Sequence, residues 1–373
     1  MYPERQLTVA GYSNETIAIA KQVFNPNTLT LGFARRFVSY KRPDLLLHDE
    51  ERFIRILTNA QHPVQLVTAG KAPPFDESGK DLIRRWIEFI QRNNLYNHVV
   101  FLSDYDMLLA EQLVQGVDVW VNTPRRPWEA SGTSGMKVLV NGGINLSELD
   151  GWWAEAYTPE VGWALGDEKE HGEDPAWDAA EAEALYDLLE KQIVPDFYNR
   201  NEQGIPEQWI KRMRKSMSNL TALFSANRSV REYTEKFYLP AAISYIKRAA
   251  NNGKEGLKIV DAQAAIKSRW NKIKFGEIQI ENSEQGYVFH LPVFLNHIEP
   301  EKVLVELYAE GINGAPQTRI QMDTDPAVNK AEENIYHAKV ISTRAPGDFT
   351  ARIITNCADV LVPLEDQLIH WQH

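Results

Sequence analysis

The sequence Trp128-Glu-Ala-Ser-Gly-Thr-Ser-Gly-Met-Lys137 follows an apolar, strand-like run, Val117-Asp-Val-Trp-Val121, and a turn-rich connector, Asn122-Thr-Pro-Arg-Arg-Pro127. It continues into Met136-Lys-Val-Leu-Val140, a segment with helical character that Asn141-Gly-Gly143 ends. A strand, a loop of small residues and a helix in this order predict one βα unit.

The loop of this unit predicts an anion-binding site. Backbone N–H groups at the start of a helix have no partner within the helix, and the helix dipole favours negative charge there. Lys137 lies four residues after Thr133, so one helical face carries both the donors of the loop and an amine. Such a phosphate cradle suits a phosphorylated aldehyde held by the lysine as a Schiff base. Loops of this composition are common, however, and most hold no cofactor.

The surrounding sequence alternates between strand and helix patterns. Strands are predicted at Leu29–Ala34, Val64–Thr68, Val99–Leu102 and Val117–Val121, and helices at Pro43–Asn59, Glu77–Arg92 and Tyr105–Val114. This alternation predicts an α/β fold with a doubly wound parallel sheet, covered by helices on both faces. Ligands of such sheets bind at the carboxyl ends of the strands, where the loops after Ala34 and Val121 should approach each other.

The rest of the chain divides into regions with different predicted secondary structure. Residues 1–27 form a lead-in with one expected helix, Glu15–Val23. Further helices are expected at Asp178–Val194, Pro206–Ala226 and Ser229–Ala249, before a break at Asn251–Gly256. Short alternating strands follow, at 277–280, 287–291, 303–308, 336–341 and 348–354, and predict a small antiparallel β-sandwich without catalytic residues. The expected domains are 1–27, 28–257 and 258–373.

A second motif, Arg35-Arg-Phe-Val-Ser-Tyr-Lys-Arg42, comes directly after the first predicted strand. Its cationic and phenolic groups fall in one βα loop, where they could face an anion above the edge of the sheet. A solvated basic loop is the alternative interpretation.

Composition is that of an ordinary globular enzyme. The 373 residues are 43% hydrophobic, which is enough for two cores, and the net charge of −11 argues against nucleic acid or an anionic membrane as partner. The sequence has no 18-residue apolar run and no hydrophobic signal core, so a cytoplasmic location is expected. Cys357 is the single cysteine and the histidines are scattered, so no metal site is indicated.

The segment Glu129–Lys137 resembles the pyridoxal-phosphate lysine motif of the α-glucan (glycogen, starch and maltodextrin) phosphorylases, E-A-S-G-T-x-x-M-K. The continuation Asn141-Gly-Gly-Ile-Asn-Leu-Ser-Glu-Leu-Asp-Gly-Trp-Trp153 resembles the bacterial short-type members. The resemblance implies pyridoxal 5'-phosphate as cofactor, held by Lys137. It also implies the C-terminal Rossmann-like domain of a two-domain, GT-B type glycosyltransferase fold.

The basic loop is similar to the phosphorylase segment K-R-I-H-E-Y-K-R, with Arg35 in place of the usual lysine and Val38 in place of a histidine. Arg35 keeps the positive charge and adds a fork that suits phosphate, whereas Val38 removes a polar contact. Weaker matches, Ala69-Gly-Lys-Ala72 and Ser103–Glu111, make Lys71 and Tyr105 candidates near the cofactor.

By this resemblance the chain would act in the retaining phosphorolysis of α-1,4-glucan to glucose 1-phosphate. The implied catalytic residues are Arg36, Lys41 and Glu129. The implied cofactor-binding residues are Lys137, Gly132, Thr133, Arg35 and Tyr105, and the implied substrate-binding residues are Tyr40, Ser131 and Glu129.

Phosphorylases work in the cleft between two doubly wound domains, and residues 1–27 are too few to form the first of them. We therefore expect the C-terminal half of a phosphorylase, as a fragment, a split-gene product or a remnant, inactive without an N-terminal-half partner chain. A homo-oligomer is also compatible with the sequence. The alternatives are a nucleotide-sugar glycosyltransferase, which needs no lysine at position 137, and a non-catalytic glucan-associated protein. In the latter, Trp152, Trp153 and Trp163 could stack on sugars unless they are buried.

Overall fold

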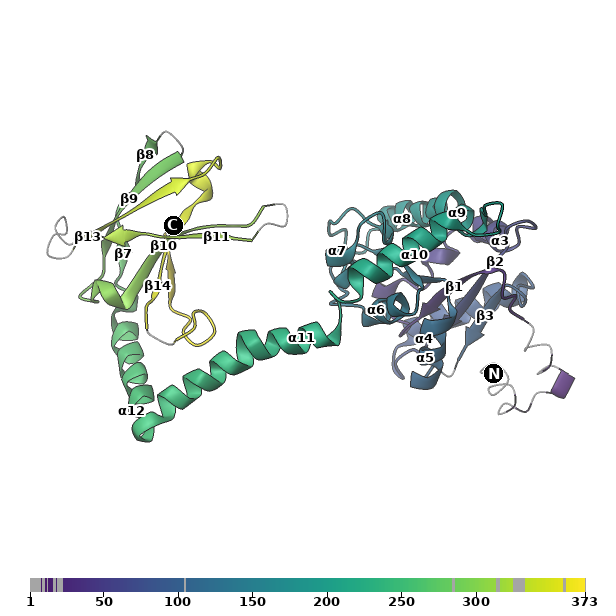
Figure 1. Ribbon diagram of the computed structural model, residues 1–373, viewed down its shortest axis with the longest axis horizontal. Helices are drawn as coiled ribbons and strands as arrows, with labels where there is room; N and C mark the ends of the chain where they lie inside the picture. The colour runs from purple at the N-terminus through teal and green to yellow at the C-terminus, as the bar shows by residue number, and fades with distance from the viewer. Residues whose placement is uncertain are drawn as a thin grey trace. The chain divides into compact units, whose positions relative to one another are not determined.

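The computed structural model describes residues 23–103, 105–283, 286–312, 316–324, 333–357 and 360–372, together with residues 8, 11, 13–15 and 18. Contacts between residues divide the chain into two units, residues 1–231 and 232–373, and each is described by itself (Figure 1). The expected helix Glu15–Val23 lies largely outside the described residues. The sequence-based boundaries after residues 27 and 257 stay predictions.

The first unit is built on a parallel sheet of six strands in the order β3-β2-β1-β4-β5-β6. Its strands are β1 (Leu29–Ala34), β2 (Val64–Ala69), β3 (Val99–Leu102), β4 (Val119–Asn122), β5 (Ile144–Glu148) and β6 (Gly162–Leu165). β1 pairs with β2 on one side and with β4 on the other, in the register Leu31–Val119. The chain thus changes direction across the sheet between β1 and β4, which is where such folds bind ligands. The predicted α/β class is confirmed.

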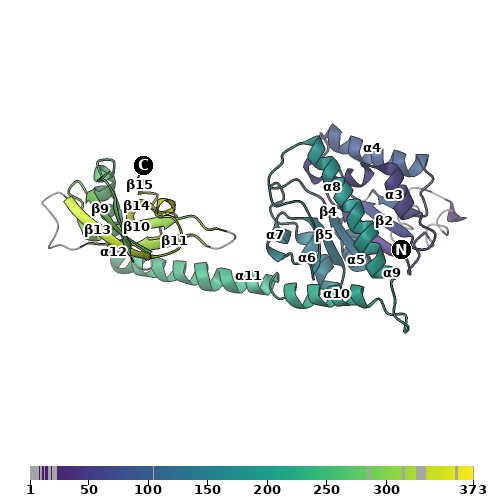
Figure 2. The same ribbon diagram turned by 90° about the horizontal axis from the view of Figure 1, so that it is seen from above.

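Helices cover both faces of this sheet. Figure 2 shows α3, α4 and α8 on one face and α5 and α6 on the other. The buried apolar side chains of α3, α4 and α8 belong to one core, and those of α5 belong to another together with Val138 of α6. The helices are α3 (Glu50–Leu57), α4 (Glu77–Arg92), α5 (Met107–Gly116), α6 (Thr133–Val140), α7 (Trp152–Ala156), α8 (Pro175–Leu188), α9 (Val194–Tyr198) and α10 (Glu207–Leu220), with 3-10 turns η1 (Ser39–Lys41) and η2 (Leu45–Leu47) and a π turn η3 (Leu189–Ile193).

Two departures from the predicted elements have local causes. The helix expected from Pro43 begins only at Glu50, because the Asp49 side chain accepts the Arg52 N–H and caps a new helix after the 3-10 turn. β5 and β6 were not predicted. All five residues of β5 are buried although Asn145, Ser147 and Glu148 are polar, so its sequence lacks an apolar run.

Several tryptophans belong to the core of this unit. Trp86, Trp120, Trp153 and Trp163 are at most 2% exposed and Trp152 is 4% exposed. The Trp86 indole N–H donates to the Pro43 carbonyl at 2.9 Å, and the Trp153 N–H donates to the Trp163 carbonyl at 3.0 Å. The three tryptophans that could have stacked on sugars therefore pack inside the protein.

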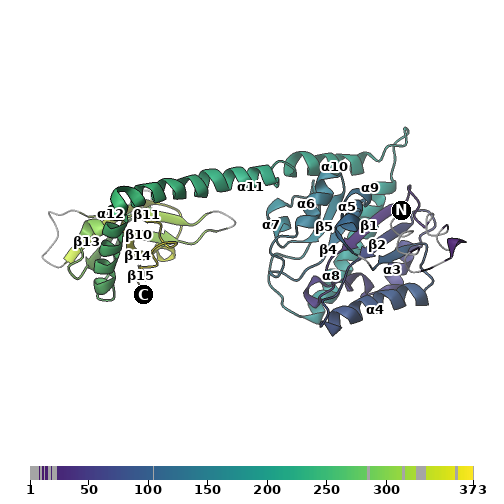
Figure 3. The same ribbon diagram turned by 90° about the horizontal axis from the view of Figure 1, so that it is seen from below.

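The second unit contains two antiparallel sheets around one core, as predicted (Figure 3). One sheet has the order β11-β10-β14-β15, and the other has the order β12-β13-β9-β7 with β8 paired to β9. The strands are β7 (Lys274–Phe275), β8 (Gln279–Ser283), β9 (Gly286–Phe294), β10 (Val303–Ala309), β11 (Thr318–Gln321), β12 (Asp323–Thr324), β13 (Glu333–Ile341), β14 (Thr350–Thr355) and β15 (Ile369–Trp371), with 3-10 turns at Pro300–Lys302 and Pro346–Asp348.

Helical residues precede these strands: α11 (Ala226–Tyr233), a π turn (Thr234–Tyr238) and α12 (Leu239–Trp270). The backbone is non-helical from Ala250 to Gly253, where the sequence predicted a break. Within the described part of the chain, no helix has the length and apolar character needed to cross a bilayer.

The cap of α4 provides a test of the fold. Asp76 accepts the Gly79 N–H at 2.9 Å, so Asp76→Ala should lower the free energy of unfolding by about 1 kcal/mol, the usual value of an N-cap. Urea-induced unfolding followed by circular dichroism measures this loss. Glu88→Ala, an exposed change on the same helix, should stay within about 0.5 kcal/mol of wild type. Equal effects of the two changes would contradict the assigned cap.

Candidate functional site

The loops after β1 and β4 meet at the carboxyl edge of the sheet, as predicted. The Arg125 N–H donates to the Tyr40 carbonyl at 2.7 Å. The Thr123 hydroxyl lies 3.2 Å from the Lys41 carbonyl and 3.1 Å from the Arg42 carbonyl. These contacts place the two sequence motifs side by side.

Two cations and one carboxylate form the centre of this junction. Lys41 Nζ lies 2.7 Å from Glu129 Oε2, and Arg35 Nη1 lies 3.3 Å from the same oxygen. The three side chains are only 7 to 11% exposed. Burial lowers the pKa of Arg35, while Glu129 acts in the opposite direction. The Glu129 carboxylate thus partly neutralises two buried cations at one point.

Arg35 keeps unused donors in this position. Its Nε and Nη1 atoms are buried, and neither makes a hydrogen bond of regular geometry to the described residues, although Nη1 lies within ion-pair distance of Glu129. Tyr105 lies nearby, with its hydroxyl 3.5 Å from the Ala34 carbonyl, and burial raises its pKa. The Lys41 amine lies 4.7 Å from the centre of the Tyr40 ring. Buried guanidinium donors without partners are costly and suit a bound anion.

The loop before α6 is held closely against the chain after β5. Asp150 Oδ2 accepts the Glu129 N–H at 2.8 Å, and the Ser131 carbonyl accepts the Trp152 N–H at 2.9 Å. A Cβ atom on Gly151 would lie 2.6 Å from the Ser131 carbonyl oxygen and 2.9 Å from that of Glu129, and its φ is +54°. Only glycine fits there without displacing the loop. The sequence motif contained Asp150 and Gly151 but gave no reason to assign them a role.

The start of α6 keeps its backbone donors available. Gly132 precedes the helix with φ of +82°, and no side chain caps the first turn. Thr133 is its first residue and is exposed. This arrangement has the features of a helix terminus that binds an anion.

Three other predicted site residues stay outside the ionic cluster. Arg36, Lys71 and Lys137 are exposed, and the described residues give none of them an ion pair. Lys137 lies on α6 with its backbone carbonyl bonded to the Asn141 amide. Their part in one common site therefore stays a prediction.

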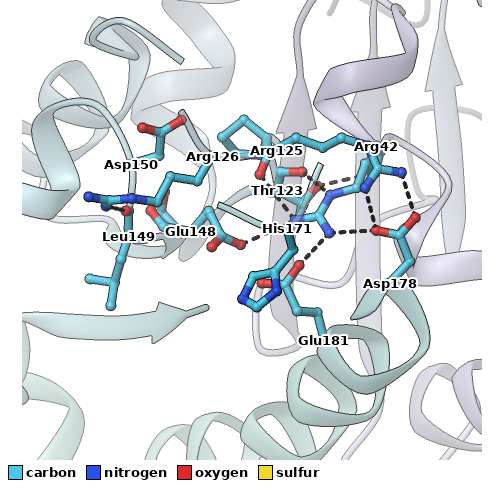
Figure 4. A network of polar contacts seen from close by, with 12 residues as sticks. Arg42, Thr123, Arg125, Arg126, Glu148, Leu149, Asp150, His171, Asp178 and Glu181 are labelled. Atoms are coloured by element: carbon cyan, nitrogen blue, oxygen red, sulfur yellow. Dashed lines mark hydrogen bonds and ion pairs between the residues drawn. The ribbon is translucent and has the colours of Figure 1, made fainter. Parts of the chain in front are cut away.

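A buried network, which the sequence did not reveal, surrounds Arg42, the residue that follows Lys41 in the chain (Figure 4). Nε donates to the Thr123 carbonyl at 3.0 Å, and Nη2 donates to the Pro124 carbonyl at 3.0 Å and to Glu148 Oε2 at 3.1 Å. Nη1 donates to Asp178 Oδ1 at 2.9 Å and to Glu181 Oε2. All five N–H groups of the guanidinium are thus used.

The acids of this network differ in ionisation. Burial raises the pKa of Glu148 to about 9, and the neighbouring Glu181 carboxylate acts in the same direction. Burial also acts to raise the pKa of Asp178, but hydrogen bonds from Arg125 and Arg42 hold that pKa below its ordinary value. Arg125 contacts Asp178 through two bonds, of 2.5 and 2.8 Å.

Comparison with known proteins gives consistent matches. Residues 13–164 match the carbohydrate phosphorylase family. The chain is 42% identical over 268 residues to a glycogen phosphorylase of Mycobacterium tuberculosis, covering 72% of this chain and 31% of that protein. It is 39% identical over 297 residues to a maltodextrin phosphorylase of Thermococcus litoralis, covering 79% and 35%. It is 43% identical over 235 residues to a glycogen phosphorylase of Aquifex aeolicus, covering 63% and 34%. The match thus spans about a third of the length of these relatives.

The ionic cluster provides a test of the site. Glu129→Gln should lower the free energy of unfolding by roughly 3 kcal/mol, because Arg35 and Lys41 then remain buried without their counter-charge. Added inorganic phosphate should raise the melting temperature of this variant more than that of wild type, since it can supply the missing negative charge. Differential scanning fluorimetry in phosphate and in chloride of equal ionic strength measures both effects.

The matched control is Glu77→Gln, which removes an exposed carboxylate that pairs with Lys80 on the surface. This control should change neither the free energy of unfolding nor the effect of phosphate on the melting temperature. A phosphate effect of the same size in Glu129→Gln, in the control and in wild type would show that the cluster does not bind anions.

Proposed function

This chain belongs to the carbohydrate phosphorylase family through residues 13–164, and we propose that it is the C-terminal catalytic part of an α-glucan phosphorylase. The proposed reaction is the retaining, pyridoxal-phosphate-dependent phosphorolysis of α-1,4-glucan to glucose 1-phosphate. The observation that supports it most directly is the buried pair of cations, Arg35 and Lys41, with unused guanidinium donors at the carboxyl edge of the sheet.

The reaction places heavy demands on positive charge. Cleavage with retention passes through an oxocarbenium-like transition state and needs a proton for the leaving oxygen. We infer that inorganic phosphate, bound by Arg36 and Lys41, supplies this proton and then attacks the anomeric carbon. A second phosphate beside it would repel it strongly unless cations and N–H donors surround both.

The chain offers groups that fit the cofactor. Lys137 would hold the aldehyde carbon, while the N–H groups of Gly132 and Thr133, together with Arg35, would hold the phosphate near Tyr105. The uncapped first turn of α6 and the unpaired donors of Arg35 support this fit. When bound, the cofactor would supply a second phosphate group to act as proton partner or electrostatic support for the substrate phosphate.

Glu129, Tyr40 and Ser131 are proposed to bind the hydroxyl groups of the glucan. Glu129 Oε2 is shared between Lys41 and Arg35 in the described structure. Arrival of phosphate at these cations would free the Glu129 carboxylate for a sugar hydroxyl, which gives one residue two successive partners.

Activity is proposed to require the part of the relatives that this chain does not match. The matched relatives are about three times as long as the matched segment, and a glucan needs binding surface on both sides of the scissile bond. The remaining part could be supplied on the same polypeptide or by a separate chain.

Cofactor attachment tests the proposed chemistry. Pyridoxal phosphate should add near-ultraviolet absorbance to the chain, and borohydride should fix the label at Lys137, as peptide mass spectrometry would show. Lys137→Ala should abolish the label with little loss of stability, because the side chain is exposed. Lys71→Ala, a change at another exposed lysine, should keep it. Labelling that is spread over several surface lysines would argue against a dedicated site.

Phosphate affinity tests the role of Arg36. Arg36→Ala should weaken the binding of inorganic phosphate by about 2 kcal/mol, the scale of a lost charge-assisted contact. Isothermal titration of the labelled protein measures this change. An affinity equal to that of wild type would remove Arg36 from the site.

Turnover tests the need for the unmatched part. Residues 1–373 alone should release little glucose 1-phosphate from maltodextrin and phosphate, since on this proposal they contribute only one side of the substrate cleft. Adding the N-terminal part of a matched relative, such as the Thermococcus litoralis maltodextrin phosphorylase, should restore activity. Fast turnover by residues 1–373 alone would refute this requirement.

A further inference from the structure

Arg42 occupies a position from which it can set the geometry of the site. It follows Lys41 directly, and its own backbone is left-handed, with φ of 43° and ψ of 55°. Its side chain donates to the carbonyl groups of Thr123 and Pro124, which begin the loop that carries Glu129. A residue without Gly, Asn or Asp character rarely adopts this backbone unless surrounding contacts hold it there. Arg42 therefore fixes the β1 loop against the β4 loop.

The acids that hold Arg42 outnumber the cations that face them. Three carboxylates, those of Glu148, Asp178 and Glu181, contact the two guanidinium groups of Arg42 and Arg125. With every acid ionised, these five groups would carry one uncompensated negative charge. Such a charge is costly at the 3% exposure of Glu148 and Glu181.

Two of the acids face each other without a donor between them. A Cβ atom built on Gly166 would lie 1.9 Å from Glu148 Oε1 and 3.4 Å from Glu181 Oε1, so both oxygens lie at the same glycine. Glu181 Oε1 is buried and has no hydrogen-bond partner among the described residues. One proton on either oxygen would provide the missing donor and neutralise the group.

Other charged groups around the pair have partners elsewhere. Arg126 donates to the Leu149 carbonyl, Asp150 accepts the Glu129 N–H, and His171 contacts Asp167 at 2.8 Å while it stacks on Trp177. Lys169 lies 3.8 Å from Asp167. The groups that face the pair from neighbouring elements are thus Arg42, Arg125, Arg126, Asp150, Lys169, His171 and Asp178.

We propose that Glu148 and Glu181 share one proton and so hold Arg42 as the positioning residue of the site, and that loss of this proton at alkaline pH loosens the loops that carry Lys41 and Glu129. In that step hydroxide takes the proton from the carboxylic acid, giving water and a second carboxylate. The functional consequence rests on the proposed function, whereas the shared proton does not.

The direction of the pH dependence follows from the two states of Glu148. The ordinary pKa of a glutamate side chain is 4.5, whereas the pKa of Glu148 is about 9 in the folded protein. Between these values the folded chain binds one proton more than the unfolded chain, so the free energy of unfolding falls as pH rises through this range. Glu148→Gln is neutral at every pH, and its carboxamide can accept from Arg42 and donate to Glu181.

The experiment compares wild type with Glu148→Gln and Glu181→Gln. In infrared spectra at neutral pH, wild type should show a carbonyl band of a protonated carboxylic acid that disappears on alkaline titration and is missing from each variant. The stability of Glu148→Gln relative to wild type should rise steadily from pH 6 to 9. Glu183→Gln, at an exposed acid on the same helix, is the control and should keep the wild-type band and slope.

The consequence for the site is measured with pyridoxal phosphate. Between pH 7 and 9.5 wild type should lose at least about fivefold more affinity than Glu148→Gln, the lower end of typical coupling between sites. Because the cofactor's own groups titrate in the same way in both proteins, the comparison with Glu148→Gln removes their contribution to the change in affinity.

The outcomes separate the two claims. A carboxylic acid band that persists in Glu148→Gln, or a wild-type stability slope equal to that of the variant, overturns the shared proton. Equal pH dependence of cofactor affinity in wild type and variant overturns the positioning role alone. If wild type binds no pyridoxal phosphate, the proposed function fails, and the shared proton is still decided by the infrared and stability measurements, which need no cofactor.

Discussion

The guanidinium of Arg42 is the contact on which the arrangement of the site depends. Its five N–H groups reach two carbonyls of the β4 loop and acids at the end of β5 and on α8. Because a guanidinium is planar and cannot be deprotonated in proteins, it fixes the direction of all these groups at once. The carboxyl edge of a parallel sheet has few regular hydrogen bonds between loops, and here one side chain supplies that order.

The ionic cluster of Lys41, Arg35 and Glu129 differs from the Arg42 network in how its donors are used. Lys41 and Arg35 share the Glu129 carboxylate, while the start of α6 keeps its backbone donors unpaired by side chains. All five N–H groups of the Arg42 guanidinium have acceptors, whereas Nε and Nη1 of Arg35 have no hydrogen-bond partner among the described residues. A site that binds a multiply charged ligand needs both, since rigidity behind the cations reduces the ordering cost of binding.

Patterns along the sequence were sufficient where the signal is local. The apolar run Leu29–Ala34 and the amphipathic segment Glu77–Arg92 coincide with β1 and α4, and the two motifs meet as the sheet topology requires. β5 was not predicted because its buried polar residues hide the apolar pattern. The partners of Arg42 could not be predicted either, since Glu148 and Glu181 lie 106 and 139 residues away in the chain. The positions of Arg36 and Lys137 relative to the ionic cluster stay predictions.

Gly166 adds an evolutionary constraint on this protein. Any side chain there would enter the space where the Glu148 and Glu181 oxygens meet, so we expect substitutions at these three positions to depend on one another. Replacing either Glu148 or Glu181 by its amide keeps the five charged groups neutral overall. Replacing both leaves one positive charge without a counter-charge. On the proposal of a shared proton, a lineage that exchanged one single amide for the other by single substitutions would therefore pass through the pair of acids, so the order of the substitutions would matter as well as their identity.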